Sequence, residues 1–163
     1  MVDVVDKGDL MLDLQRPFVV EGRADGLLRG VCRLLDGMGL GVLPEMSLGN
    51  GRRPDVVGLD GKGRVTIVEI KSGLADYRAD RKWPEYLPWC DAFYFAVAVD
   101  FPREALPSDV GLIVADRYAA DIVRRAPAQA MAAHRRRKLT LRFARIGAAR
   151  LRGHYGEPGA ETA

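Results

Sequence analysis

The chain has little of what several classes of protein require. It contains two cysteines and two histidines in 163 residues, and both histidines lie in the basic C-terminal part, so no Cys/His cluster indicates a zinc site. Cys32 and Cys90 lie among apolar residues, which predicts reduced core thiols rather than a disulfide. No apolar run reaches the roughly 18 residues that a membrane span needs, and the first residues are acidic, unlike a signal peptide. We therefore expect a cytoplasmic protein that does not enter the membrane.

The composition is that of an ordinary globular protein, with 48% hydrophobic and 29% charged residues, and the length suits one domain. The net charge of +3 hides an asymmetry, because residues 122–156 hold ten Lys or Arg and no Asp or Glu. Concentrated positive charge is typical of a protein that binds a polyanion. A solvated helix with arginines on its outer face is the alternative interpretation.

The order of hydrophobic periods predicts a three-layer α/β domain with a mixed central sheet. We expect helices over residues 21–38, 74–83 and 131–152, a short helical piece near 118–125, and strands over 42–48, 55–59, 65–71, 92–99 and 111–115. The expected boundaries are a flexible acidic arm over 1–18, a single domain over 19–153 with a basic helical extension from about residue 118, and a frayed tail over 154–163.

The most informative stretch is residues 53–71, R-P-D-V-V-G-L-D-G-K-G-R-V-T-I-V-E-I-K. Glu69 and Lys71 are two apart on a strand and therefore share one face of the sheet. If residues 61–63 form a three-residue hairpin loop, Asp55 lies directly opposite Glu69. A four-residue loop would set Asp55 against Val68 instead, so the register decides whether the two carboxylates meet.

Two adjacent carboxylates repel each other unless a cation lies between them. Carboxylate oxygens and waters suit a hard octahedral cation, which predicts Mg²⁺ or Mn²⁺ as the cofactor, bound by Asp55 and Glu69. Such a cation activates water toward a phosphodiester. Lys71, on the same face, is placed to stabilise the charge that develops on phosphorus.

The P-D of Pro54–Asp55 and the E-I-K of Glu69–Lys71 resemble the two halves of the PD-(D/E)xK nuclease motif. The run V-E-I-K-S-G-L-A-D-Y-R-A-D-R-K-W-P-E-Y-L is similar to the MmcB-type bacterial DNA-repair proteins, over nearly the whole chain. The resemblance implies a restriction-endonuclease-like αβββαβ core with a C-terminal helical extension. It also implies a Mg²⁺ site at Asp55 and Glu69, with Lys71 as the catalytic lysine.

Members of this superfamily often carry a further acid or a further residue on the second helix. Glu45 and Glu21 are candidates for the acid, Glu45 as a third metal ligand, and Lys82 is the candidate catalytic residue on the second helix, with Tyr86 one turn later. Other polar and aromatic residues nearby have simpler expected roles. Solvated helix charges are expected at Asp76 and Asp80, and packing around the prolines is expected for Trp83, Tyr86 and Trp89.

The basic C-terminal helix is expected to contact DNA phosphates without sequence choice. One helical stripe carries the cations, and a second face is apolar and suited to docking on the domain. The stripe consists of Lys138, Arg142, Arg145 and Arg152, and the apolar face of Leu139, Phe143 and Ile146.

These features together predict a metal-dependent, endonuclease-like protein that hydrolyses phosphodiester bonds of DNA during repair. One alternative is a DNA-structure-binding repair accessory module that keeps the nuclease-like fold and does not cleave. A second alternative is an RNA-directed nuclease with a similar core. Several relatives act as dimers, so a second copy of the chain, or other repair proteins, are further expected partners beside DNA.

Overall fold

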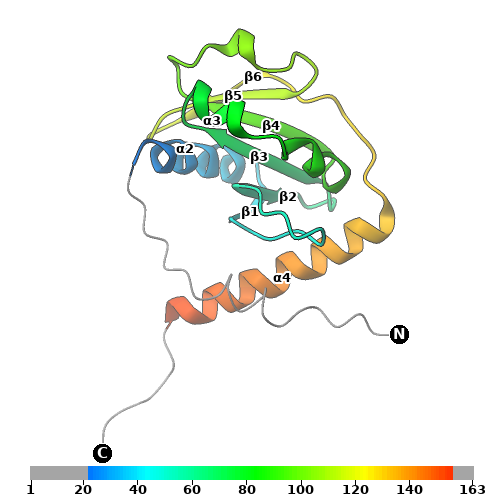
Figure 1. Ribbon diagram of the computed structural model, residues 1–163. Helices are drawn as coiled ribbons and strands as arrows, with labels where there is room; N and C mark the ends of the chain where they lie inside the picture. The colour runs from blue at the N-terminus through cyan, green and yellow to red at the C-terminus, as the bar shows by residue number, and fades with distance from the viewer. Residues whose placement is uncertain (1–21, 156–163) are drawn as a thin grey trace, which may run out of the picture.

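The computed structural model describes residues 22–155, which form a mixed six-stranded sheet with helices on both faces (Figure 1). The expected acidic arm over 1–18, Glu21 and most of the expected frayed tail lie outside the described residues. The strands lie side by side in chain order, and they are β1 Gly41–Pro44, β2 Val56–Leu59, β3 Val65–Lys71, β4 Ala92–Val97, β5 Gly111–Ala115 and β6 Ala120–Arg124.

Strands β1, β2 and β3 pair antiparallel, β3, β4 and β5 pair parallel, and β6 returns antiparallel to β5. The central strand β3 has six buried residues out of seven, as its β-branched run predicts for a strand covered on both faces. Because side chains alternate along a strand, Ile67 packs in the core on one side of the sheet and Val68 in the core on the other.

Helix α2 (Arg23–Gly37) covers one face of the sheet. Leu27, Val31 and Leu35 recur every four residues, so they form one stripe, and all three are buried. The helix gives way to Gly39, whose positive φ of 83° turns the chain into β1.

The opposite face is covered by three segments: α3 (Leu74–Ala79), the 3-10 helix η1 (Trp83–Trp89) and the long helix α4 (Ala133–Tyr155) (Figure 1). The expected three-layer α/β architecture, including the αβββαβ order, is confirmed. The expected aromatic packing is also confirmed, since the Trp83 ring stacks on Phe93 with 5.5 Å between centroids. Cys32 and Cys90 are both free thiols, Cys90 fully buried and Cys32 partly so.

Helix α4 docks through its expected apolar side, with Leu139 and Ile146 buried against the sheet layer and Phe143 partly buried. A polar anchor lies at its first turn, where the Arg136 guanidinium binds both oxygens of Asp91 at 2.7 and 2.6 Å. Asp91 also accepts a hydrogen bond from the backbone N–H of Val65 at 2.7 Å. The start of α4 is therefore tied to the starts of both β3 and β4.

Four expected elements differ from the structure. The first strand ends at Pro44 rather than at residue 48. The second helix ends at Ala79 rather than near residue 83, because the prolines at 84 and 88 favour the short 3-10 turns of η1. The short helix expected near residues 118–125 is instead strand β6, whose exposure alternates along its length as in an edge strand. Helix α4 continues to Tyr155, so residues 154 and 155 of the expected frayed tail are helical.

Candidate metal centre and its surroundings

The β2–β3 hairpin has the register that the sequence predicts. Leu59 pairs with Val65 and Val56 with Val68, and the backbone N–H of Asp60 donates to the carbonyl of Arg64 at 3.0 Å across a three-residue loop. Continuing this register by one residue sets Asp55 opposite Glu69. The backbone N–H of Asp55 lies 3.4 Å from Glu69 Oε2, so the predicted neighbourhood of the two acids is confirmed.

Glu69 and Lys71 are buried at the carboxyl end of β3, with 9% and 3% of their surface exposed. Lys71 Nζ donates to Glu69 Oε1 at 3.3 Å and to Asp80 Oδ2 at 2.7 Å. Asp55 Oδ2 accepts the backbone N–H of Ile70 at 2.6 Å. We call these four side chains, Asp55, Glu69, Lys71 and Asp80, the acid–lysine cluster.

The cluster holds three carboxyl groups and one ammonium group, so its net charge is negative when all four are ionised. Burial raises the pKa of Asp55 to about 6, against the opposing effects of the Ile70 N–H and Lys71. Burial, followed by the charge of Asp55, raises the pKa of Glu69 to about 8. The two neighbouring acids thus favour either a bound proton or a bound cation.

The donor set fits a hard divalent cation. Asp55 and Glu69 offer carboxylate oxygens side by side, and Mg²⁺ is commonly held by one or two carboxylates, with waters and substrate phosphate completing its shell. Within residues 22–155, no group of three or more His, Cys, Asp or Glu side chains is arranged to hold a metal ion by itself. A cation here would therefore depend on solvent or substrate oxygens for much of its coordination.

Glu45 follows β1 and continues the row of acids across the sheet. Its backbone N–H donates to the carbonyl of Asp55 at 2.8 Å, and its charge contributes to the raised pKa of Asp55. Its φ of 49° is unusual for a residue other than glycine. The side chain is 46% exposed and lies 3.9 Å from Arg53, so the role of Glu45 as a third ligand stays a prediction.

The expectation that Asp80 is a solvated helix charge is wrong. Its side chain is 14% exposed, and besides holding Lys71 it accepts the backbone N–H of Lys82 at 2.7 Å. Burial alone would raise the pKa of Asp80, but the Lys71 ammonium and the backbone donors lower it. The sequence carries one signal for this role, an aspartate shortly before the Trp83–Pro84 start of a helical turn, where a carboxylate can accept backbone N–H groups that have no partner within the turn.

Lys82 and Tyr86 do not behave as the expected pair on one helical face. Lys82 is exposed just before η1, and its side chain lies outside the acid–lysine cluster. Tyr86 is buried, and its hydroxyl donates to the carbonyl of Arg53 at 3.4 Å. Burial and the nearby charges of Glu69 and Asp55 raise the pKa of Tyr86, which places the phenol at the cluster. A catalytic role for Lys82 stays a prediction.

The expected outward stripe of cations on α4 needs one correction. Arg142 is partly buried and turned toward the domain, where it donates to the carbonyl of Ser47 at 2.7 Å and to the Ser47 hydroxyl. The stripe therefore keeps Lys138, Arg145 and Arg152, which are exposed. Their contact with DNA remains a prediction.

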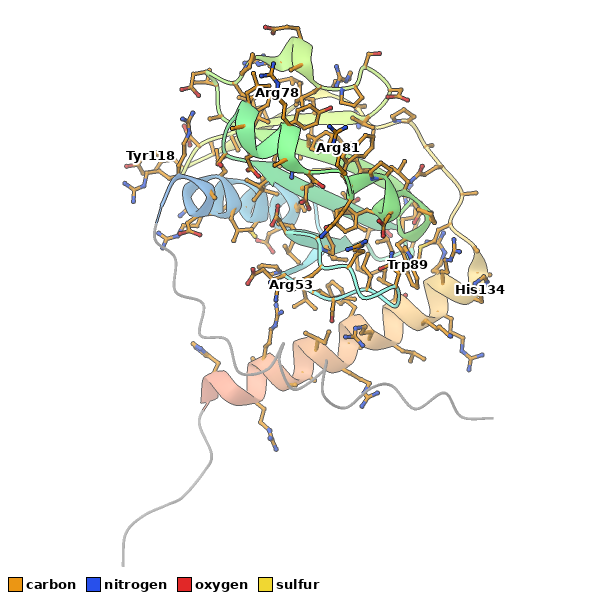
Figure 2. The ribbon with its side chains drawn as sticks, viewed as in Figure 1. Arg53, Arg78, Arg81, Trp89, Tyr118 and His134 are labelled. Carbon is orange, nitrogen blue, oxygen red and sulfur yellow. The ribbon has the colours of Figure 1, made fainter. Side chains whose placement is uncertain are left out.

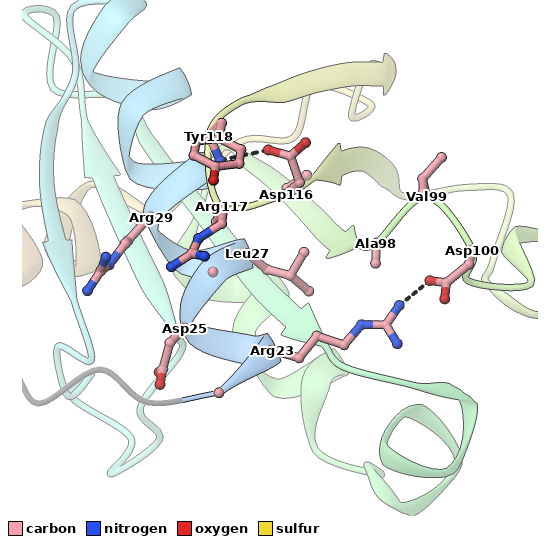
Figure 3. A pocket seen from close by; sticks show the side chains of 13 residues that line it. Arg23, Asp25, Leu27, Arg29, Ala98, Val99, Asp100, Asp116, Arg117 and Tyr118 are labelled. Carbon is pink, nitrogen blue, oxygen red and sulfur yellow. Dashed lines mark hydrogen bonds and ion pairs between the residues drawn. The ribbon is translucent and has the colours of Figure 1, made fainter.

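A separate hollow of about 610 Å³ lies at the carboxyl ends of β4 and β5, beside the start of α2 (Figure 3). Arg23 forms an ion pair with Asp100 across it, and Arg117 lies over the exposed ring of Tyr118. Its charged lining is balanced, with three arginines and three aspartates. None of its lining residues belongs to the acid–lysine cluster.

The fold and the site define a mixed α/β domain with a buried cluster of acids and one lysine at the end of a central strand. The chain belongs to the family described as DNA repair protein MmcB-like, whose model matches residues 20–157, and this membership indicates a role in DNA repair. It is similar to a solved structure of a protein of unknown function from Silicibacter pomeroyi, with a TM-score of 0.82 and 40% identity over 88% of this chain and 100% of that chain. No match was found among curated proteins.

None of the helices within residues 22–155 is long and apolar enough to cross a membrane.

Proposed function

We propose that the chain is a Mg²⁺- or Mn²⁺-dependent endonuclease that hydrolyses phosphodiester bonds of DNA during repair. The observation that carries the proposal is the juxtaposition of Asp55 and Glu69 across the β2–β3 hairpin, with Lys71 on the same face. Membership of a DNA-repair family supports DNA as the substrate.

Each residue of the cluster would have its own role in the reaction. Asp55 and Glu69 would hold the cation, which when bound lowers the pKa of a water molecule and polarises the phosphodiester. Lys71 carries its positive charge on a buried ammonium, because burial lowers its pKa less than Asp80 and Glu69 raise it. A fixed cation in a site largely shielded from water stabilises developing charge on phosphorus more strongly than one in solvent.

The test is cleavage of a panel of linear and branched DNAs with Mg²⁺ or Mn²⁺ by the wild-type protein, Glu69→Gln and the matched surface variant Glu104→Gln. Glu104 is exposed on a short 3-10 turn away from the cluster. We expect metal-dependent cleavage by the wild type and by Glu104→Gln, and none by Glu69→Gln. Equal cleavage by both variants would assign the activity to another site or to a contaminant.

A second candidate function is a repair accessory module that binds DNA without cutting it. It is favoured by one observation, that Lys71 is already engaged by two carboxylates in the structure. DNA binding by the wild type without cleavage of any member of the panel, under either metal, would support this candidate.

A further inference from the structure

We propose that DNA is held by the exposed cations around the acid–lysine cluster, and not mainly by helix α4. We call these four residues, Arg53, Arg78, Arg81 and Lys82, the arginine rim. The inference rests on the proposed function only in taking the cluster as the place where the DNA backbone arrives. It assigns the surface on which that backbone lies.

The structure fixes one side of the rim to the cluster through Asp80. One oxygen of Asp80 holds Lys71 Nζ at 2.7 Å, and the other accepts the backbone N–H of Lys82, also at 2.7 Å. Arg78 and Arg81 lie within two residues of this aspartate and are exposed. Arg78, in the last turn of α3, and Arg81 and Lys82, in the short break between α3 and η1, therefore flank a member of the cluster.

Arg53 supplies the other side. It lies two residues before Asp55, and its carbonyl accepts the hydroxyl of Tyr86, which is itself influenced by the charges of Asp55 and Glu69. Figure 2 shows Arg78 and Arg81 on the α3 side of this face and Arg53 on the side of the β1–β2 strands. A backbone crossing between them would pass over the end of β3.

The rim arginines have few partners within the protein and can therefore bind phosphates, whereas several other arginines are already paired. Within residues 22–155, the side chains of Arg78 and Arg81 have no hydrogen bond or ion pair, and the pairing of Arg53 with Glu45 spans 3.9 Å. On α4, Arg136 and Arg142 are committed to Asp91 and Ser47, which leaves Arg145 and Arg152 as exposed cations of that helix to compare with the rim.

The local charge explains why a rim is needed. The ionised acid–lysine cluster carries a charge of −2, from three acids and one lysine, and would repel a phosphodiester. Four surrounding cations offset this charge, together with that of the neighbouring Glu45 and Asp76, and so lower the repulsion that an approaching polyanion meets. Contacts of this kind bind phosphates without reading sequence, as a repair protein acting at many sites requires.

The test is fluorescence anisotropy with a labelled 20-base-pair DNA duplex at several salt concentrations in EDTA, so that neither metal binding nor cleavage enters the measurement. The rim variant is Arg78→Ala with Arg81→Ala. Its matched control is Arg29→Ala with Arg125→Ala, which removes the same charge from exposed positions outside the rim. Thermal melts of both variants check that the fold is retained.

Each lost phosphate contact makes the salt slope shallower by about 0.9, which at 0.15 M salt corresponds to about a fivefold loss of affinity. We therefore expect the rim variant to bind about 30-fold more weakly, with a slope shallower by about 1.8, and the control to stay within about threefold of the wild type. A variant of α4, Arg145→Ala with Arg152→Ala, should behave like the control.

An unchanged slope in the rim variant would overturn the inference, and a shallower slope only in the α4 variant would place DNA on that helix. Tighter binding to an RNA duplex of the same sequence would overturn the choice of DNA. Because binding is measured without metal, a protein that binds through the rim and never cleaves would refute the proposed endonuclease activity alone.

Discussion

Burying two acids side by side should give the metal-free protein an unusual dependence of stability on pH. Carboxylates such as Asp80 and Asp91 have pKa values below that of the unfolded chain, 3.8, so their contribution to stability is present above this pH and is lost as the pH falls through their folded pKa. Glu69 has the opposite sign, because its pKa rises from 4.5 in the unfolded chain to about 8. Its favourable contribution is complete below pH 4.5 and is lost as pH rises toward 8.

The size of the effect follows from proton linkage. Between pH 5 and 7.5 the native state binds about one proton more than the unfolded state at this residue, so the free energy of unfolding falls by about 1.4 kcal/mol per pH unit. From pH 4.5 to 7 the loss amounts to about 3 kcal/mol. Glu69→Gln removes this titrating group and keeps its shape, so the free energy of unfolding of the variant should fall by about 3 kcal/mol less than that of the wild type over the same range, and the decline that remains is that of Asp55, whose pKa burial raises to about 6.

Urea unfolding in EDTA at half-unit steps from pH 5 to 8 measures the difference, with Glu104→Gln as the surface control. Repeating the series with Mg²⁺ should restore stability to the wild type at pH 7.5, by about 2.7 kcal/mol when the metal is at 100 times its dissociation constant. Parallel curves for the wild type and Glu69→Gln, or equal responses to Mg²⁺, would refute the view that this acid pair is the cation site.

Three further substitutions test contacts that hold the site in place. Asp91→Asn breaks the two-oxygen ion pair with Arg136, and we expect a loss of about 2 kcal/mol in urea unfolding, with α4 exchanging its amide hydrogens faster. Arg142→Ala removes the bonds to Ser47 and should cost about 1 kcal/mol while leaving the salt slope of DNA binding unchanged, which anisotropy would show. Asp80→Ala leaves a buried ammonium with one fewer partner, so we expect a loss of about 3 kcal/mol, and a loss no larger than that of Asp76→Ala would contradict this role.

The parts of the site that could be predicted from the sequence depend on short-range geometry. The loop D-G-K-G allows a three-residue hairpin with Gly63 at its positive-φ position, 76°, and the hairpin in turn fixes the register over the following residues. Period-two alternation then places Glu69 and Lys71 on one face. No information from distant parts of the chain is needed for either step.

The parts that could not be predicted depend on contacts between distant segments. A helical pattern in α4 identifies a cationic stripe, but it does not show that Arg142 meets Ser47, which is 95 residues away in sequence. Strand β6, with the sequence A-D-I-V-R, mixes apolar and charged residues without a strong period, and its pairing with β5 decides its conformation. In both cases the tertiary environment overrides what local preference suggests.

At Asp80, the local backbone conformation and a contact with a distant residue, Lys71, depend on each other. Its backbone is extended, with φ −85° and ψ 114°, so α3 stops one residue earlier, and the side chain can bind both Lys71 and the start of η1. Had the helix continued to residue 83, as periodicity predicts, residue 80 would have helical backbone angles instead, and its side chain would leave the cluster. The break in the helix and the anchoring of the lysine are therefore one feature. It follows that changes which favour a longer α3, such as Pro84→Ala, act on the site through Asp80 even though they touch none of its ligands.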